Sequence, residues 1–259
     1  MIIGLIVGGI LVGKNLIEAA EVRNAMTSIE KLKTSINAFI LKYDCLPGDC
    51  VNATKFFPTC VDVSEWPHGY FNSCNGTGTG VYSPDPTRGM IRFFQHLYLS
   101  GMSDKPVNGI WGSVLTPGVN VPQYDWLDKN RIRGGATGDF KTDKLSLGII
   151  DNWWGYQTTN GCELWQPVNI ALRNSDRRIM VQSINDDRST TMCPGYGGLS
   201  RDFTLKLDKK FDDGLPYSGT IQVPNYVNAG GSSNCSNATA YYTSPQNTTN
   251  DTCWTGFLN

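Results

Sequence analysis

The chain has 259 residues, a formal net charge of −1 and 17% charged residues. It carries no dense basic patch, which argues against nucleic acid as a partner. About 215 residues follow the N-terminal helix predicted below, enough for one domain with a sizeable core.

Residues 1 to 43 have an uninterrupted helical pattern. Residues 1 to 13 are apolar on every side with only glycines between them, so they must be buried in lipid or among other helices. From residue 14 to 43 the apolar residues recur at steps of three and four, which predicts one buried stripe: Val22, Ala25, Ile29, Leu32, Ile36, Phe39 and Tyr43. No proline precedes Leu46-Pro47-Gly48, so we expect one rod roughly 65 Å long.

Three interpretations compete for the apolar segment 1 to 13. Lys14 and Glu18 end the run well short of the roughly 20 residues of a free-standing transmembrane helix. A secretory signal peptide suits this length, with Ala19-Ala20 near a cleavage point, but the basic first segment is absent. In the third, spacings such as Gly4-x-x-x-Gly8 let copies of the helix pack closely. The packing residues would be Ile3, Gly4, Leu5, Val7, Gly8, Gly9, Ile10, Leu11 and Gly13.

The cysteines are even in number and scattered, without a Cys-x-x-Cys pair: Cys45, Cys50, Cys60, Cys74, Cys162, Cys193, Cys235 and Cys253. This usage predicts disulfides in an exported protein. We expect neighbours in sequence to pair: Cys45 with Cys50, Cys60 with Cys74, Cys162 with Cys193, and Cys235 with Cys253. The alternative is a zinc site of Cys45, Cys50, Cys60, His68 and Cys74, although the ligand pairs of structural zinc sites usually lie closer together in sequence.

The head, residues 44 to 259, is predicted to be α+β. A helix over 88 to 100, ended by Gly101, presents one apolar face: Met90, Phe94, Leu97 and Tyr98. Strands are predicted at 144–150, 168–172, 178–183 and 220–223. Ser200 caps a second helix that ends at 214–216 and carries Phe203, Leu207 and Phe211.

An antiparallel sheet would then cover the stripe of the long helix, and a coiled coil is the alternative use of that stripe. Residues 225 to 252 are rich in Asn, Ser, Thr and Gly. They predict a long surface loop tied down by Cys235 and Cys253.

Residues with chemistry are few. The chain lacks the motifs of esterases, phosphate-binding loops and zinc proteases, so we do not expect an enzyme. His96 lies in a predicted helix, where packing or a backbone hydrogen bond is the expected role. Three carboxylates near a glycine turn are a candidate calcium site, with ordinary turn chemistry as the alternative: Asp208, Asp212 and Asp213. Exposed tryptophans would bind sugars or a protein, with a core cluster as the alternative: Trp153, Trp154 and Trp165.

The N-terminal pattern also carries a family resemblance. The apolar string Ile2 to Gly13, then Leu16 to Arg23, a lysine-dotted amphipathic stretch, and Lys42-Tyr43-x-x-Leu46-Pro47-Gly48-Asp49 closely resemble bacterial type IV pilin-like proteins and type II secretion pseudopilins. Further segments look like landmarks of a branch of that family: Asn52 to Phe56, Arg92 to Leu97, Pro117 to Pro122 and Asp208 to Gly219. The resemblance covers most of the chain and is strongest at residues 1 to 55.

The resemblance implies a structural subunit. Its N-terminal helix would be held in the inner membrane and then transferred into the core of a periplasmic or cell-surface filament, beside copies of itself or related subunits. The large head suggests a minor, adhesive subunit more than a bulk one. Calcium binding in a C-terminal loop also occurs among such pseudopilins.

Family members carry about ten residues before the position of Met1, so we expect the gene start to lie upstream. The alternative function is an exported monomeric module that binds carbohydrate or protein, with residues 1 to 20 as a signal or anchor.

Overall fold

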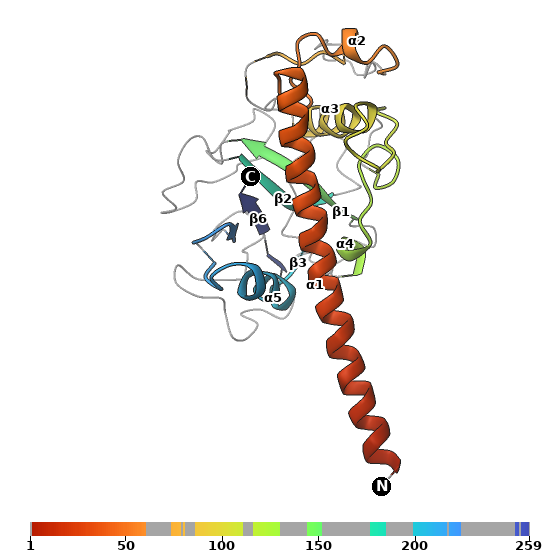
Figure 1. The fold of residues 1–259 in the computed structure, drawn as a ribbon, viewed down its shortest axis with the longest axis vertical. Helices are drawn as coiled ribbons and strands as arrows, with labels where there is room; N and C mark the ends of the chain where they lie inside the picture. Colours follow the sequence, from red (N-terminus) through yellow and green to blue (C-terminus); the bar gives the residue numbers. More distant parts are fainter. Residues whose placement is uncertain are drawn as a thin grey trace, which may run out of the picture.

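The computed structural model describes residues 2–60, 74–78, 80, 86–110, 116–129, 144–151, 177–184, 199–216, 218–223, 252–253 and 255–258. Its dominant element is the helix α1, Ile2–Tyr43. Figure 1 shows α1 as a rod whose first third projects from the head, with α2 near its far end. The predicted long helix is therefore confirmed, and it ends where Asp44 adopts a φ of 54°.

The predicted stripe of α1 is the part of the helix that enters the head. Six of its members are fully buried and belong to one hydrophobic core, while Tyr43 packs at the edge of that core: Val22, Ala25, Ile29, Leu32, Ile36 and Phe39. Burying a side chain of this size contributes roughly 1.5 to 3 kcal/mol. Among the described elements α1 packs chiefly against the helices α5, α4 and α3.

The other helices are short. They are α2 (Ala53–Phe56), α3 (Pro86–Leu99), α4 (Asp125–Lys129) and α5 (Arg201–Phe211). As predicted, Gly101 follows α3 with a φ of 74°, and Ser200 caps α5 by accepting a hydrogen bond from the Phe203 amide at 3.2 Å. Of the predicted apolar faces, Phe94, Leu97, Phe203 and Leu207 are buried, whereas Tyr98 and Phe211 are exposed. Both lie near the end of their helix, where the turn faces solvent.

The main sheet has the strand order β1, β2, β6, β4, and every neighbouring pair is antiparallel. The strands are Lys144–Asp151, Arg177–Ile184, Thr255–Leu258 and Ile221–Gln222 respectively. Ile179, Phe257 and Ile221 are aligned across three of these strands, and all three belong to the core that contains the α1 stripe. A smaller sheet pairs β3 (Leu199–Ser200) with β5 (Thr252–Cys253).

Trp126 of α4 belongs to this core. It is among the largest fully buried side chains, and its ring stacks on Phe203 of α5 with a centroid distance of 6.3 Å. The predicted strand at 168–172 and nearly all of the predicted loop 225 to 252 lie outside the described residues, apart from Thr252, which belongs to β5.

Candidate functional site

The projecting part of α1 is the first candidate site. Ile3 is 79% exposed and Ile10 is 66% exposed, and five more large apolar side chains are exposed along the same segment: Ile6, Leu11, Val12, Leu16 and Ile17. A Cβ atom added at Gly4, Gly8, Gly9 or Gly13 would meet nothing within 4 Å. The side chains of Leu5 and Val7 lie outside the description. This segment, residues 3 to 17, is called the stalk below.

An ion pair marks the place where the stalk meets the head. The Lys206 ammonium of α5 donates a hydrogen bond to the Glu18 carboxylate at 2.5 Å. That hydrogen bond and the charge of Lys206 lower the pKa of Glu18. Val22, four residues later, is buried. The ion pair therefore lies at the boundary between the exposed and the buried parts of α1. Glu18, which ended the predicted apolar run, therefore has a partner in the head.

The predicted pairings Cys45–Cys50 and Cys60–Cys74 are confirmed as disulfides. Cys253 is also disulfide-bonded, but its partner and the cysteines at 162, 193 and 235 lie outside the described residues. The zinc alternative is wrong for the four cysteines in its ligand set, because they form two disulfides. His68 lies outside the described residues.

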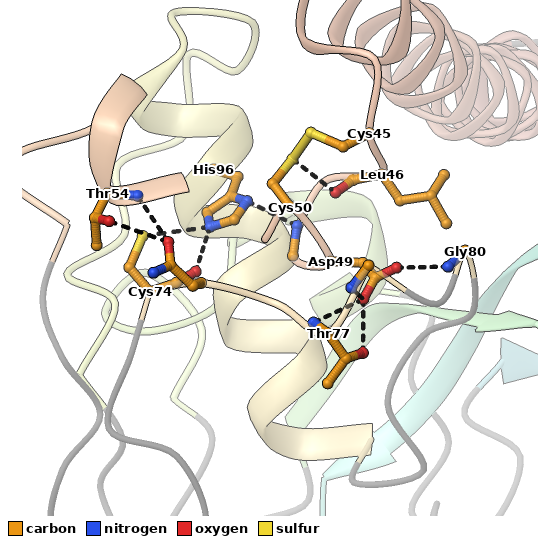
Figure 2. Close-up of a disulfide and its surroundings, with 12 residues drawn as sticks. Cys45, Leu46, Asp49, Cys50, Thr54, Cys74, Thr77, Gly80 and His96 are labelled. Atoms are coloured by element: carbon orange, nitrogen blue, oxygen red, sulfur yellow. Dashed lines mark hydrogen bonds between the residues drawn. A yellow bond between two sulfur atoms is a disulfide. The ribbon is translucent and has the colours of Figure 1, made fainter. Parts of the chain in front are cut away.

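His96 of α3 joins the segments that carry these two disulfides. The Gly48 amide donates to His96 Nδ1 at 2.8 Å, so this nitrogen carries no proton and the neutral ring has its proton on Nε2. Nε2 lies 3.0 Å from the Cys74 carbonyl oxygen and donates to it. Figure 2 shows the ring between the two segments.

The surroundings of His96 keep it neutral. The ring is fully buried and stacks on Phe39 at a centroid distance of 6.0 Å. Burial, the largest cause, lowers the pKa of His96 to about 4, and the charge of Arg92 acts in the same direction, while the bond to Cys74 opposes them. The expected packing and backbone hydrogen bonding of His96 are therefore confirmed.

Asp49 organises the loop that follows α1. Its side chain is only 5% exposed, yet it accepts hydrogen bonds from the amide and hydroxyl of Thr77, at 3.0 and 2.9 Å, and from the amides of Gly78 and Gly80, at 2.9 and 2.8 Å. Figure 2 shows the bonds from Thr77 and Gly80 beside the Cys45–Cys50 disulfide. At Gly76 a Cβ atom would lie 2.2 Å from Asp49 Cα, so only glycine fits this approach.

The predicted carboxylate cluster does come together. Oxygen atoms of Asp208, Asp212 and Asp213 all lie within 4.8 Å of one another. Each of these residues also accepts a hydrogen bond from a backbone amide, donated by Gly214, Ile221 and Leu215 respectively. The turn chemistry that was the alternative to a calcium site is thus present, because these bonds fix the loop after α5. Calcium binding stays a prediction.

Two glycine-to-alanine substitutions test how tightly the loop after α5 is held. Gly219→Ala is expected to lower the free energy of unfolding by roughly 2 to 4 kcal/mol. Gly219 has a φ of 69°, and its Cβ would lie 2.1 Å from Asp212 Oδ2, so the carboxylate that accepts from Ile221 must move. The control is Gly101→Ala, with a φ of 74° and nothing within 4 Å of its Cβ, for which we expect about 1 kcal/mol. Equal losses in urea unfolding would contradict the tight contact.

The tryptophans proposed for binding, Trp153, Trp154 and Trp165, lie outside the described residues. Sequence reasoning missed the buried role of Asp49, which depends on residues far along the chain. The only local signal was a carboxylate next to a glycine in a segment otherwise apolar.

Comparisons with known protein families, with characterised proteins and with solved structures found no match to this chain. Among the helices of the described residues, none combines the length and the apolar character that crossing a membrane requires.

Proposed function

We propose that this chain is a pilin-like structural subunit whose stalk is buried among the stalks of neighbouring subunits in a filament, with no catalytic role. The observation that carries the proposal is the stalk itself: seven large apolar side chains, from Ile3 to Ile17, are exposed along one projecting segment of α1. Soluble proteins rarely leave so large an apolar surface uncovered, and such surfaces mark contacts with proteins or lipid.

The glycines of the stalk favour another helix as the cover. Because nothing lies within 4 Å of the Cβ positions at Gly4, Gly8, Gly9 and Gly13, a second backbone has room to approach closely there. In a copy of this chain, residues 3 to 13 of the stalk are apolar on all sides and match this surface. Before assembly, we propose, the segment is held in the inner membrane, as the resemblance to pilins and pseudopilins implies.

The head supports the same proposal. In a pilin-like fold the second part of the long helix is the spine of the head and packs on an antiparallel sheet. Here the α1 stripe shares its core with Ile179, Ile221 and Phe257 of the main sheet. We propose that this is a pilin-like α+β arrangement, enlarged by α3, α4 and α5.

A bulky substitution in the stalk tests the function. Gly9→Phe is expected to abolish the filament, measured as at least a tenfold loss of subunit from sheared surface fractions, while the thermal unfolding of the head stays unchanged. The reason is that the added ring meets nothing within the subunit but blocks a close helix pair. The control is Leu41→Phe, which adds bulk near the other end of α1. Leu41 is 87% exposed, so this variant should assemble normally.

N-terminal peptide sequencing of the recovered protein separates this proposal from an exported binding module. A filament subunit retains Ile2 to Val12 in its mature form. A mature terminus near Ala20 or Glu21, or normal assembly of Gly9→Phe, would contradict the proposed filament role.

A further inference from the structure

The two sulfur atoms of the Cys60–Cys74 disulfide have different surroundings. Cys60 is half-buried, and its Sγ lies 3.2 Å from Gln95 Oε1. Cys74 is only 1% exposed, and its Sγ lies 3.4 Å from His96 Nε2. The Cys60 sulfur therefore faces a hydrogen-bond acceptor. The Cys74 sulfur faces His96 Nε2, which donates to it only when that nitrogen carries a proton.

The tautomer of His96 fixes that proton on Nε2, because Nδ1 accepts from the Gly48 amide. Nε2–H is thus shared between the carbonyl oxygen and the sulfur of Cys74. Arg92 adds a positive charge: its Nη1 donates to the carbonyl oxygen of Asn75, the residue after Cys74, at 2.9 Å. A hydrogen bond donated to a thiolate favours that charged form, so the Nε2–H group favours negative charge on Cys74 over Cys60. The Gln95 oxygen disfavours it on Cys60.

We propose that Cys60–Cys74 is a site of directional thiol exchange with a protein dithiol of the thiol–disulfide oxidoreductase class. The partner's thiolate attacks Cys60 Sγ, and a bond forms between the two sulfurs. The Cys60–Cys74 bond breaks, and its electron pair stays on Cys74 as a thiolate that accepts from His96 Nε2–H and then takes a proton from water. In reverse, the Cys74 thiolate attacks the mixed disulfide at Cys60 and expels the partner, which forms the native bond.

In the other described disulfide, the buried sulfur, that of Cys50, faces an acceptor and not a donor. Cys50 Sγ lies 3.3 Å from the Leu46 carbonyl oxygen, an acceptor, which disfavours a thiolate at Cys50. The rate of exchange rises as the pKa of the leaving thiol falls. Cys45–Cys50 is therefore expected to open more slowly than Cys60–Cys74.

The direction of exchange is tested on the full oxidised chain with reduced glutathione as the attacking thiol. Samples are quenched with an alkylating reagent at increasing times and mapped by peptide mass. The expected first product carries glutathione on Cys60 and the alkyl group on Cys74, at least tenfold in excess over glutathione on Cys74. Glutathione chiefly on Cys74, or earlier opening of Cys45–Cys50, would overturn the proposal.

A matched pair of variants isolates the Nε2 donor. His96→Gln places an amide near the former Nε2 and keeps a donor for Cys74, whereas His96→Asn places its amide near Nδ1 and keeps only the Gly48 bond. Both remove the buried ring, so a general loosening of the fold acts on both. Exchange at Cys60 is expected to be roughly tenfold slower in His96→Asn than in His96→Gln, as the loss of a hydrogen bond to a charged group implies. Equal rates would exclude His96 as the positioning residue.

This inference does not rest on the filament role. Exchange is measured on the isolated chain, whereas the Gly9→Phe experiment measures assembly, so either can fail alone.

Discussion

Replacing Asp49 by alanine is expected to lower the free energy of unfolding by roughly 3 to 5 kcal/mol. The carboxylate is almost fully buried and accepts from Thr77, Gly78 and Gly80. Without it, the loop loses four hydrogen bonds to one carboxylate, and the buried position that the carboxylate fills is left empty. Urea unfolding of the oxidised protein measures the loss, since the disulfides stay closed.

Two further substitutions make this test specific. Asp49→Asn keeps the shape and one acceptor oxygen, so its loss should be smaller than that of Asp49→Ala. Asp104→Ala removes an exposed carboxylate that lies 4.0 Å from the Lys31 ammonium, and it should change stability by less than about 0.5 kcal/mol. If Asp49→Ala were as mild as Asp104→Ala, the hydrogen bonds around Asp49 would not be organising the loop.

His96 is expected to make the protein less stable in acid by roughly 3 kcal/mol. Burial lowers its pKa from the ordinary 6.5 to about 4. Below pH 6.5 the unfolded chain gains a proton at this position, whereas the folded chain does not do so until about pH 4. The contribution of neutral His96 is therefore complete above pH 6.5, decreases as the pH falls from 6.5 to 4, and decreases no further below that.

The measurement compares the wild type with His96→Gln, which cannot titrate at this position. Carboxylates titrate in both proteins, so the difference between their unfolding free energies reports His96 alone. We expect the variant to be less stable at pH 8 and the difference to shrink toward pH 4. A difference that stays constant over this range would mean that the histidine titrates alike in the folded and unfolded chain.

The parts of the fold that depend on local sequence were predictable. The α1 stripe follows from the spacing of residues such as Ile29 and Ile36, and the Ser200 cap from the residue type that precedes an amphipathic helix. Strands at 144–150 and 178–183 followed from alternation and correspond to β1 and β2. The two disulfides that can be checked join neighbouring cysteines, for which short loops suffice.

Features that depend on distant partners were not predictable. Asp49 acquires its role only because residues 74 to 80 return to it, and no pattern around position 49 encodes that contact. Strand β6 is four residues long and follows a polar stretch, so its own sequence carried little signal. The carboxylates of Asp208, Asp212 and Asp213 could be predicted as a group, because a helix end and a turn keep them close in sequence. The backbone amides that donate to them could not be predicted, because those contacts depend on the folded loop.

The continuity of α1 governs how the protein responds to a pull on its N-terminal end. The stalk and the spine of the head are one helix, and the far end of that helix is fixed by the Cys45–Cys50 crosslink and the Asp49 loop. A pull on the stalk therefore acts parallel to the buried stripe and is opposed by the contacts from Val22 to Phe39 together, in shear, instead of peeling them apart one at a time. Tension along the helix axis thus meets the whole core, whereas a sideways force on the stalk meets first the ion pair between Glu18 and Lys206 at the edge of the head.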